Sequence, residues 1–252
     1  MSLKGVLLAG GSGSRLLPLT LVTNKHLLPV HDRPMIFYPL YTLSEMGCHE
    51  VLVVVGGRSV GDILELLQDG SDMDLSLTYR YQRGALGIAH AIGLAREFAG
   101  DDPIVIVLGD NIVHGSLREF AQGFVASEAE AGAVLKAVPD PERFGVAELD
   151  TSGQPIRFEE KPDRPKSNFI PIGVYMFRPS VFDVLAGLKP SARGEFEITD
   201  VLNHYIARGS LTHTVLDGDW HDAGTIPSLL EANRFAAQFP REMPHISGHQ
   251  DE

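Results

Sequence analysis

The strongest constraint on the fold is a regular alternation of short apolar runs and helical stretches in the first half of the chain. Strands are predicted for the apolar runs at residues 4–9, 51–55, 75–81 and 104–108. Helices are predicted between these strands, at residues 35–46, 60–68 and 85–98. This order indicates βαβ units, in which right-handed crossovers join parallel strands. The predicted class is therefore α/β, with helices on both faces of a mostly parallel sheet.

A different pattern begins after about residue 130. Three shorter strands are predicted there, at residues 133–138, 144–150 and 156–159. Turn-forming residues separate them, which indicates a small antiparallel or mixed excursion from the sheet. The chain continues with one core strand and two helices, at residues 169–177, 196–207 and 226–239. We predict a three-layer, Rossmann-like mixed sheet in a single domain over residues 1–240, followed by a polar tail at residues 241–252.

Composition and charge exclude several classes of protein. The 252 residues are 44% hydrophobic and 21% charged, as in ordinary folded globular proteins. The net charge of −12 argues against a nucleic-acid surface, because binding a phosphate backbone requires clustered Lys and Arg. No apolar run approaches the ~20 residues that span a bilayer, and residues 1–9 are too short for a signal peptide, so we expect no membrane role.

The single cysteine, Cys48, has no partner for an internal disulfide. It follows an apolar stretch, where we expect a buried structural thiol. A chain with one unpaired cysteine and no leader is predicted to be cytoplasmic.

A glycine-rich loop gives the first indication of chemistry. The segment from Leu7 to Thr20 reads LLAGGSGSRLLPLT, so a buried strand opens into a run of small residues, which are Gly10, Gly11, Ser12, Gly13 and Ser14. Glycines let the backbone approach a ligand and turn consecutive N–H groups towards an anion. Arg15 adds a charged fork for phosphate oxygens. The loop therefore predicts polyphosphate binding.

The loop differs from two familiar phosphate-binding motifs. It lacks the GK[ST] ending of a Walker loop and the GxGxxG spacing of dinucleotide-binding proteins, and a plain tight turn is the alternative. Lys25 follows ten residues after Arg15 as a second cation. A phosphate contact and a solvated loop position are both open for it, and beside Arg15 we favour the phosphate contact.

The segments LAGGSGSRL and NKHLLPV together resemble the sugar-phosphate nucleotidyltransferases, most closely the glucose-1-phosphate thymidylyltransferases. The resemblance continues in order through PMIFYPL, VLGDN, FGV, EEKP, GVYMF, RGEFEITD and WHDAGT, and so covers nearly the whole chain. It implies an enzyme that joins dTTP and glucose 1-phosphate into dTDP-glucose with release of pyrophosphate. It also implies small-molecule substrates, a homo-oligomer, a nucleotide-binding part at residues 1–130 and a sugar-phosphate-binding part at residues 131–240, where the antiparallel excursion would bind the sugar.

The resemblance implies a Mg²⁺ site made by two aspartates. Asp110 follows the strand at residues 104–108, so it lies at a carboxyl end of the sheet, where α/β proteins bind ligands. It matches the family's magnesium aspartate, and a turn-capping Asp is the alternative. Asp222 of WHDAGT matches the second metal carboxylate, although taken alone it is more typical of a helix N-terminus. Two carboxylates with triphosphate oxygens and waters suit Mg²⁺.

The other site residues are implied by the same match. The expected catalytic residues are Arg15, Lys25, Asp110, Lys161 and Asp222. The nucleotide is expected to contact Leu8, Gly10, Gly11, Ser12, Gly13, Ser14, Arg15, Gln82, Gly87 and Asp110. The sugar phosphate is expected to contact Asn111, Gly145, Glu160, Lys161, Ile172 and Arg193. The Gln82 amide complements thymine or uracil, but a flipped amide would also serve cytosine, so the base stays open.

Two alternative functions remain beside this one. The first is the same chemistry with UTP or with another sugar or cyclitol 1-phosphate, and the second is a nucleotide-sensing subunit without catalysis. The chain departs from the family's pattern at Ser14, where Thr is commoner, and at His26, where Gln is common. It also ends soon after its last predicted helix, so we do not expect feedback inhibition through a second nucleotide site.

Overall fold

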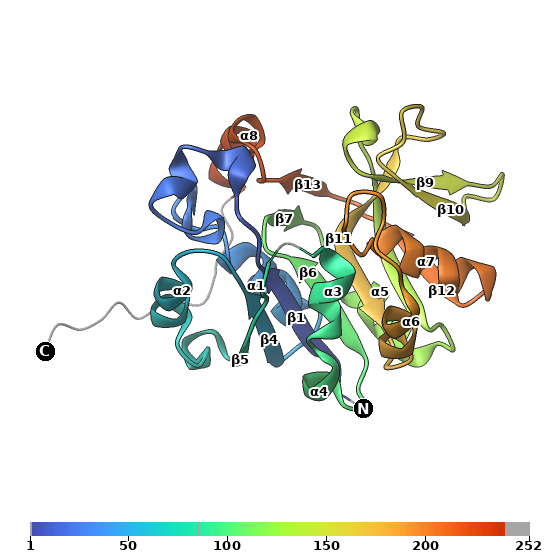
Figure 1. Ribbon diagram of the computed structural model, residues 1–252, viewed down its shortest axis with the longest axis horizontal. Coiled ribbons are helices and arrows are strands. Elements are labelled where there is room, and N and C mark those ends of the chain that lie inside the picture. The colour runs from blue at the N-terminus through green and yellow to red at the C-terminus, as the bar shows by residue number, and fades with distance from the viewer. Residues whose placement is uncertain (1, 85, 240–252) are drawn as a thin grey trace, which may run out of the picture.

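The computed structural model describes residues 2–84 and 86–239. At its centre lies a sheet of seven strands in the order β12-β8-β11-β6-β1-β4-β5, with helices on both faces (Figure 1). The strands are β1 (Lys4–Ala9), β4 (Glu50–Val55), β5 (Ser76–Tyr81), β6 (Ile104–Leu108), β8 (Ala131–Ala137), β11 (Phe169–Phe177) and β12 (Leu211–Val215). Of these seven, β11 alone runs antiparallel to its two neighbours. The predicted α/β class with a mixed, mostly parallel sheet is confirmed.

Strand β1 explains why both faces of the sheet are covered. Successive side chains of a strand point to opposite faces, and both sets are buried in β1. Leu7 packs into one core layer and Val6 into the other. The first layer includes α1 (Phe37–Glu45), α2 (Val60–Leu67) and α5 (Arg118–Ala126). The second includes α3 (Ile88–Gly93), α4 (Arg96–Ala99), α6 (Val181–Gly187) and α7 (Ile198–Ala207).

Short antiparallel pairs and a C-terminal helix extend this layered body. The pairs are β2 (Pro29–Val30) with β3 (Arg33–Pro34), β7 (Asn111–His114) with β13 (Asp219–Asp222), and β9 (Gly145–Leu149) with β10 (Pro155–Glu160). Helix α8 (Ile226–Gln238) begins with a capping box between Thr225 and Ser228. Its Leu229 joins Leu16 and Val30 in a third buried cluster, so the end of the described chain packs beside the segment that follows the glycine-rich loop.

The strands predicted at residues 104–108 and 169–177 have these bounds in the structure. The single helix predicted at residues 85–98 is wrong, because Gly87, with φ of 92°, precedes α3, and α4 is separate. Its first position, residue 85, lies outside the described residues, as does the predicted tail at 241–252. The elements β7, β12, β13, α5 and α6 were not predicted. The division into a nucleotide-binding and a sugar-phosphate-binding part stays a prediction. No helix among residues 2–84 and 86–239 is long and apolar enough to cross a membrane.

The predicted burial of Cys48 is confirmed. The residue is fully buried in the core beside α1, and burial raises the pKa of its thiol to about 12. Because the thiolate is the reactive form, we expect Cys48 to be inert towards a disulfide reagent at pH 8 in the folded protein and to react fully in denaturant. Absorbance on release of thionitrobenzoate checks this. Stoichiometric reaction within the mixing time without denaturant would contradict it.

Candidate active site

The carboxyl ends of the parallel strands form the edge at which the predicted site residues gather. Strand β1 leads into Gly10, β5 into Gln82 and β6 into Asp110. Asp222 arrives by another route, because it ends β13, which pairs with β7 and places Asp222 opposite Asn111. This short antiparallel pair brings two distant carboxylates together. The alternative of Asp222 as a helix N-terminal residue is wrong, since Thr225 caps α8.

The glycine-rich loop presents unused backbone donors. No backbone N–H from Gly10 to Ser14 donates a hydrogen bond to another residue of the described chain. Gly11 and Gly13 have φ of 104° and 63°, which is the left-handed region that glycine tolerates. The loop is held in shape by the Thr20 hydroxyl, which donates to the Gly13 carbonyl over 2.9 Å. Consecutive free donors of this kind form an anion-binding concavity.

Three charged side chains converge on the buried Gly224. A Cβ atom on this residue would lie 2.7 Å from Asp222 Oδ1, 3.1 Å from Arg15 Nη2 and 3.3 Å from Asp110 Oδ2. These side chains come from the loop after β1, the turn after β6 and the end of β13. The Gly224 N–H donates to Asp222 Oδ1 over 3.0 Å, whereas Arg15 donates to no side chain in the described ranges. The guanidinium of Arg15 is therefore free to take a phosphate.

The two aspartates differ in their electrostatics. Burial favours the protonated form of Asp110, but the charge and the 2.6 Å hydrogen bond of Lys25 outweigh it and hold the pKa at about 2. Burial, followed by the charge of Asp110, raises the pKa of Asp222 to about 6, although Arg15 and Lys25 oppose this rise. Two carboxylates therefore repel one another in a buried site, which is the situation that a bound cation relieves.

A cavity of about 210 Å³ adjoins the aspartates on the side of β9, β10 and β11. The predicted residues that line it are Arg15, Asp110, Asn111, Gly145, Glu160, Lys161, Ile172, Arg193 and Asp222. The complete set of residues expected to bind the sugar phosphate is thus gathered in one place. Leu8, the loop glycines, Lys25, Gln82 and Gly87 lie outside this lining. The structure therefore separates the residues expected to bind the sugar phosphate from most of those expected to bind the nucleotide, with Arg15 and the aspartates between the two groups.

Arg193 lies among three carboxylates within this cavity. Its guanidinium nitrogens are 3.3 Å from Glu160 Oε1, 2.8 Å from Glu195 Oε2 and 3.3 Å from Glu197 Oε1. Burial, followed by the charge of Glu197, raises the pKa of Glu160. Lys161 lies 4.0 Å from Glu160 and is half exposed, so it is less fully neutralised than Arg193. It has φ of 43°, which is uncommon for a residue with a side chain and is seen at functional sites.

The predicted Asn111 and Ile172 contact one another directly. The Asn111 side-chain amide donates to the Ile172 carbonyl, and Asn111 is buried. Ile172 lies where the pairing of β11 with β8 is interrupted between Pro171 and Tyr175. The interruption frees this carbonyl from the sheet ladder and makes it available to Asn111.

Comparison with known proteins decides the family. The profile of the nucleotidyl transferase family matches residues 4–238. The chain belongs to this family. It is a nucleotidyltransferase, and enzymes of this kind act on a nucleotide and a sugar phosphate and generally depend on a divalent metal ion.

Individual relatives are similar over most of this nucleotidyltransferase. It is 41% identical to the low-salt glycan biosynthesis nucleotidyltransferase Agl11 of Haloferax volcanii, over 94% of this chain and 66% of that protein. It is 42% identical to the glucose-1-phosphate thymidylyltransferase of Neisseria meningitidis, over 92% of this chain and 82% of that protein. A crystal structure from Bacillus anthracis, described as a glucose-1-phosphate thymidylyltransferase with bound sucrose, has a TM-score of 0.91 and 44% identity, covering 96% of this chain and 98% of that one.

Several residues of the candidate site were not predicted. Gly224 lies within WHDAGT, where its closeness to three charged groups left no signal in the sequence. The cavity is also lined by Arg143, Glu195, Glu197 and Trp220. Glu195 and Glu197 stand in RGEFEITD with period-two spacing from Arg193, which is the pattern that could have identified them. Arg143 stands directly before FGV and was not singled out in the sequence.

Asn24 fixes the segment that carries Lys25. Its side-chain oxygen accepts from the backbone N–H of His26 over 3.1 Å and lies 2.8 Å from His26 Nδ1. Its side-chain nitrogen donates to the carbonyls of Gly56, over 3.1 Å, and Arg58, over 3.0 Å. His26 itself is fully buried against Gly109, the residue before Asp110. Asn24 therefore ties the lysine segment to the loop after β4.

The change Asn24→Ala is expected to lower the free energy of unfolding by about 2–3 kcal/mol, because it leaves buried donors and acceptors without partners. Urea denaturation followed by circular dichroism measures this change. Asn24→Asp is a second test of the same network. It keeps an acceptor for His26 but places a carboxylate oxygen against the carbonyls of Gly56 and Arg58, so this variant should also be less stable. A loss below about 0.5 kcal/mol in both variants would contradict the role of this network.

Proposed function

We propose that the chain transfers a nucleotidyl group from dTTP to glucose 1-phosphate, giving dTDP-glucose and pyrophosphate. The observation that carries this proposal is the convergence of Arg15, Asp110 and Asp222 around Gly224. This convergence lies between a loop with free backbone donors and a cavity lined by the residues expected to bind the sugar phosphate. The names of several relatives point to the same substrates.

The two aspartates fit a divalent cation, which we take to be Mg²⁺. Asp110 and Asp222 are hard oxygen donors, and burial together with Asp110 raises the pKa of Asp222, so the pair gains from a positive charge between them. Asp110 and Asp222 would hold the ion. When bound, Mg²⁺ supplies positive charge to phosphate oxygens.

The proposed reaction needs no proton transfer. An oxygen of the sugar phosphate forms a bond to the α-phosphorus, and the bond from the α-phosphorus to the bridging oxygen breaks, so pyrophosphate leaves with that electron pair. Both reactants are already ionised, so the protein's work is positioning and charge neutralisation. The free N–H groups of the loop and Arg15 bind the leaving phosphates, and Lys25 adds charge from beside Asp110.

The nucleophile is oriented from the cavity side. Lys161, less fully neutralised than Arg193, attracts the phosphate of the sugar substrate. The charge of Arg193 is already neutralised by three glutamates. Arg193 therefore orients the sugar phosphate by hydrogen bonds more than it attracts it by charge. Glu160 accepts hydrogen bonds from sugar hydroxyls, which removes part of the burial penalty that raises its pKa.

A substrate panel tests this proposal. Purified protein is incubated with each pairing of dTTP, UTP or dCTP with glucose, galactose or glucosamine 1-phosphate and Mg²⁺, and pyrophosphate release is measured. The highest kcat/KM is expected for dTTP with glucose 1-phosphate, and EDTA should abolish turnover. Highest activity with UTP or with another sugar phosphate would move the proposal to that pair. Nucleotide binding without any turnover would favour a sensing subunit.

A homo-oligomer and a cytoplasmic location stay predictions. Size-exclusion chromatography with light scattering tests the oligomeric state.

A further inference from the structure

The side chain of Gln82 is oriented by the protein before any base binds. Gln82 follows β5 and is nearly buried. Its amide nitrogen lies 3.4 Å from the Gly87 carbonyl and 3.2 Å from Nδ1 of His90. A carbonyl oxygen accepts hydrogen bonds and never donates them, so the amide nitrogen, rather than its oxygen, faces Gly87.

The same geometry uses both hydrogens of the amide. One goes to Gly87 and the other to His90, so Nδ1 of His90 is the acceptor and the ring proton sits on Nε2. The Gln82 oxygen accepts no hydrogen bond from any residue in the described ranges. It is also not fully buried, so a ligand can reach it. It lies over the glycine-rich loop, where a Cβ on Gly10 would be 2.8 Å away. Gln82 therefore offers a nucleotide a free acceptor and no donor.

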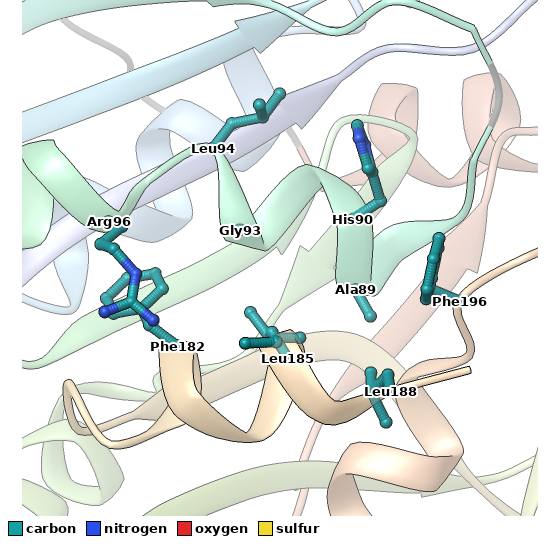
Figure 2. A pocket seen from close by; sticks show the side chains of 10 residues that line it. Ala89, His90, Gly93, Leu94, Arg96, Phe182, Leu185, Leu188 and Phe196 are labelled. Carbon is teal, nitrogen blue, oxygen red and sulfur yellow. The ribbon is translucent and has the colours of Figure 1, made fainter. Parts of the chain in front are cut away.

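His90 is well placed to hold this orientation. It lies in α3, and its ring stacks on Phe196 with centroids 6.4 Å apart. An apolar cavity of about 350 Å³ lies between α3 and α6, and His90 and Phe196 are among the residues that line it. Figure 2 shows these two rings at one end of the group of lining side chains. Phe196 also fixes the start of α3, because its carbonyl accepts from Ala89 and would lie 2.6 Å from a Cβ on Gly87. The imidazole therefore has a defined position beside Gln82.

We propose that His90 is a positioning residue that, together with the Gly87 carbonyl, sets base selection by keeping the Gln82 amide from flipping. This inference rests on the proposed function, because it takes Gln82 to meet the base. With the oxygen outward, Gln82 accepts from a ring N–H, which thymine and uracil have at N3. Cytosine has an acceptor at N3, so two acceptors would face one another. His90 thus acts on the preference for a pyrimidine with an N3–H through Gln82, which it helps to orient.

The test compares His90→Leu with His90→Asn. Leucine removes the shorter of the two contacts that hold the amide nitrogen and leaves only the 3.4 Å contact with the Gly87 carbonyl. The amide should then flip more readily, and the ratio of kcat/KM for dTTP to that for dCTP should fall about tenfold. Asparagine can place Oδ1 near the position of Nδ1 and should keep the ratio within about threefold of the unchanged protein. Asparagine is a poorer helix former than leucine. If the change in the ratio came from unfolding of helix α3, His90→Asn would therefore be impaired more than His90→Leu.

Binding of dTTP and dCTP to the same proteins is measured by titration calorimetry. Equal losses for both nucleotides in His90→Leu, with an unchanged ratio, would overturn the positioning role. A failure of His90→Asn to restore the ratio would also count against it. If the protein binds dTTP in preference to dCTP but releases no pyrophosphate, the proposed transfer fails while the calorimetric ratio still decides the role of His90.

Discussion

Replacing Asp222 by asparagine is expected to lower the rate of pyrophosphate release by about a thousandfold, because one of the two carboxylates proposed to hold Mg²⁺ loses its charge. The variant should be at least as stable as the unchanged protein in EDTA. Burial beside Asp110 raises the pKa of Asp222, so its ionised form is unfavourable in the folded state, and an amide of the same shape removes that repulsion. Activity and stability should therefore change in opposite directions.

The matched control is Asp219→Asn in the same strand. Asp219 begins β13 and is exposed, whereas Asp222 ends it. Steady-state turnover and thermal melting in EDTA, both at pH 7.5, measure the two variants side by side. Asp219→Asn should stay within about twofold of the unchanged protein, as is usual for exposed positions. Near-normal turnover in Asp222→Asn with a folded circular-dichroism spectrum would contradict the assignment of the metal site.

Replacing Gly224 by alanine is expected to reduce kcat by about a hundredfold, since a displacement of about 1 Å in a reacting constellation has an effect of this size. The added methyl group would lie 2.7 Å from Asp222 Oδ1 and 3.1 Å from Arg15 Nη2, so both groups must move. The Gly224 backbone does not have a positive φ, so alanine causes no conformational strain there. The effect should therefore appear in turnover and metal affinity rather than in folding.

Gly123→Ala provides the control for this change. Gly123 lies inside α5, and apart from its chain neighbours and the backbone of its own helix, no described atom would lie within 4 Å of a Cβ there. It should keep full activity and gain up to about 1 kcal/mol of stability, because alanine is the better helix former. Turnover and apparent Mg²⁺ affinity are measured for both variants. Unchanged values of both quantities in Gly224→Ala would show that the three charged groups tolerate displacement.

Arg193 illustrates the limit of reading roles from a motif. RGEFEITD identified it as a phosphate contact, and the structure does place it in the cavity. The sequence did not reveal that Glu160, Glu195 and Glu197 surround its guanidinium. Glu160 comes from β10, so its position relative to Arg193 depends on how that strand packs beside the segment before α7. The role of a charged loop residue can be assigned only when the residues around it are known.

The sequence by itself determined the layered α/β fold, the glycine-rich loop and the polar residues at strand ends, because periodicity and turn chemistry are local properties of the chain. The tertiary structure decided which of these residues meet. Asp222 reaches Asp110 through the pairing of β13 with β7, and both elements are too short to leave a periodic pattern. The orientation of the Gln82 amide likewise involves the Gly87 carbonyl and the ring of His90, which stacks on Phe196. Contacts between distant segments arise from how buried surfaces fit together, and that information is not held in any local stretch of sequence.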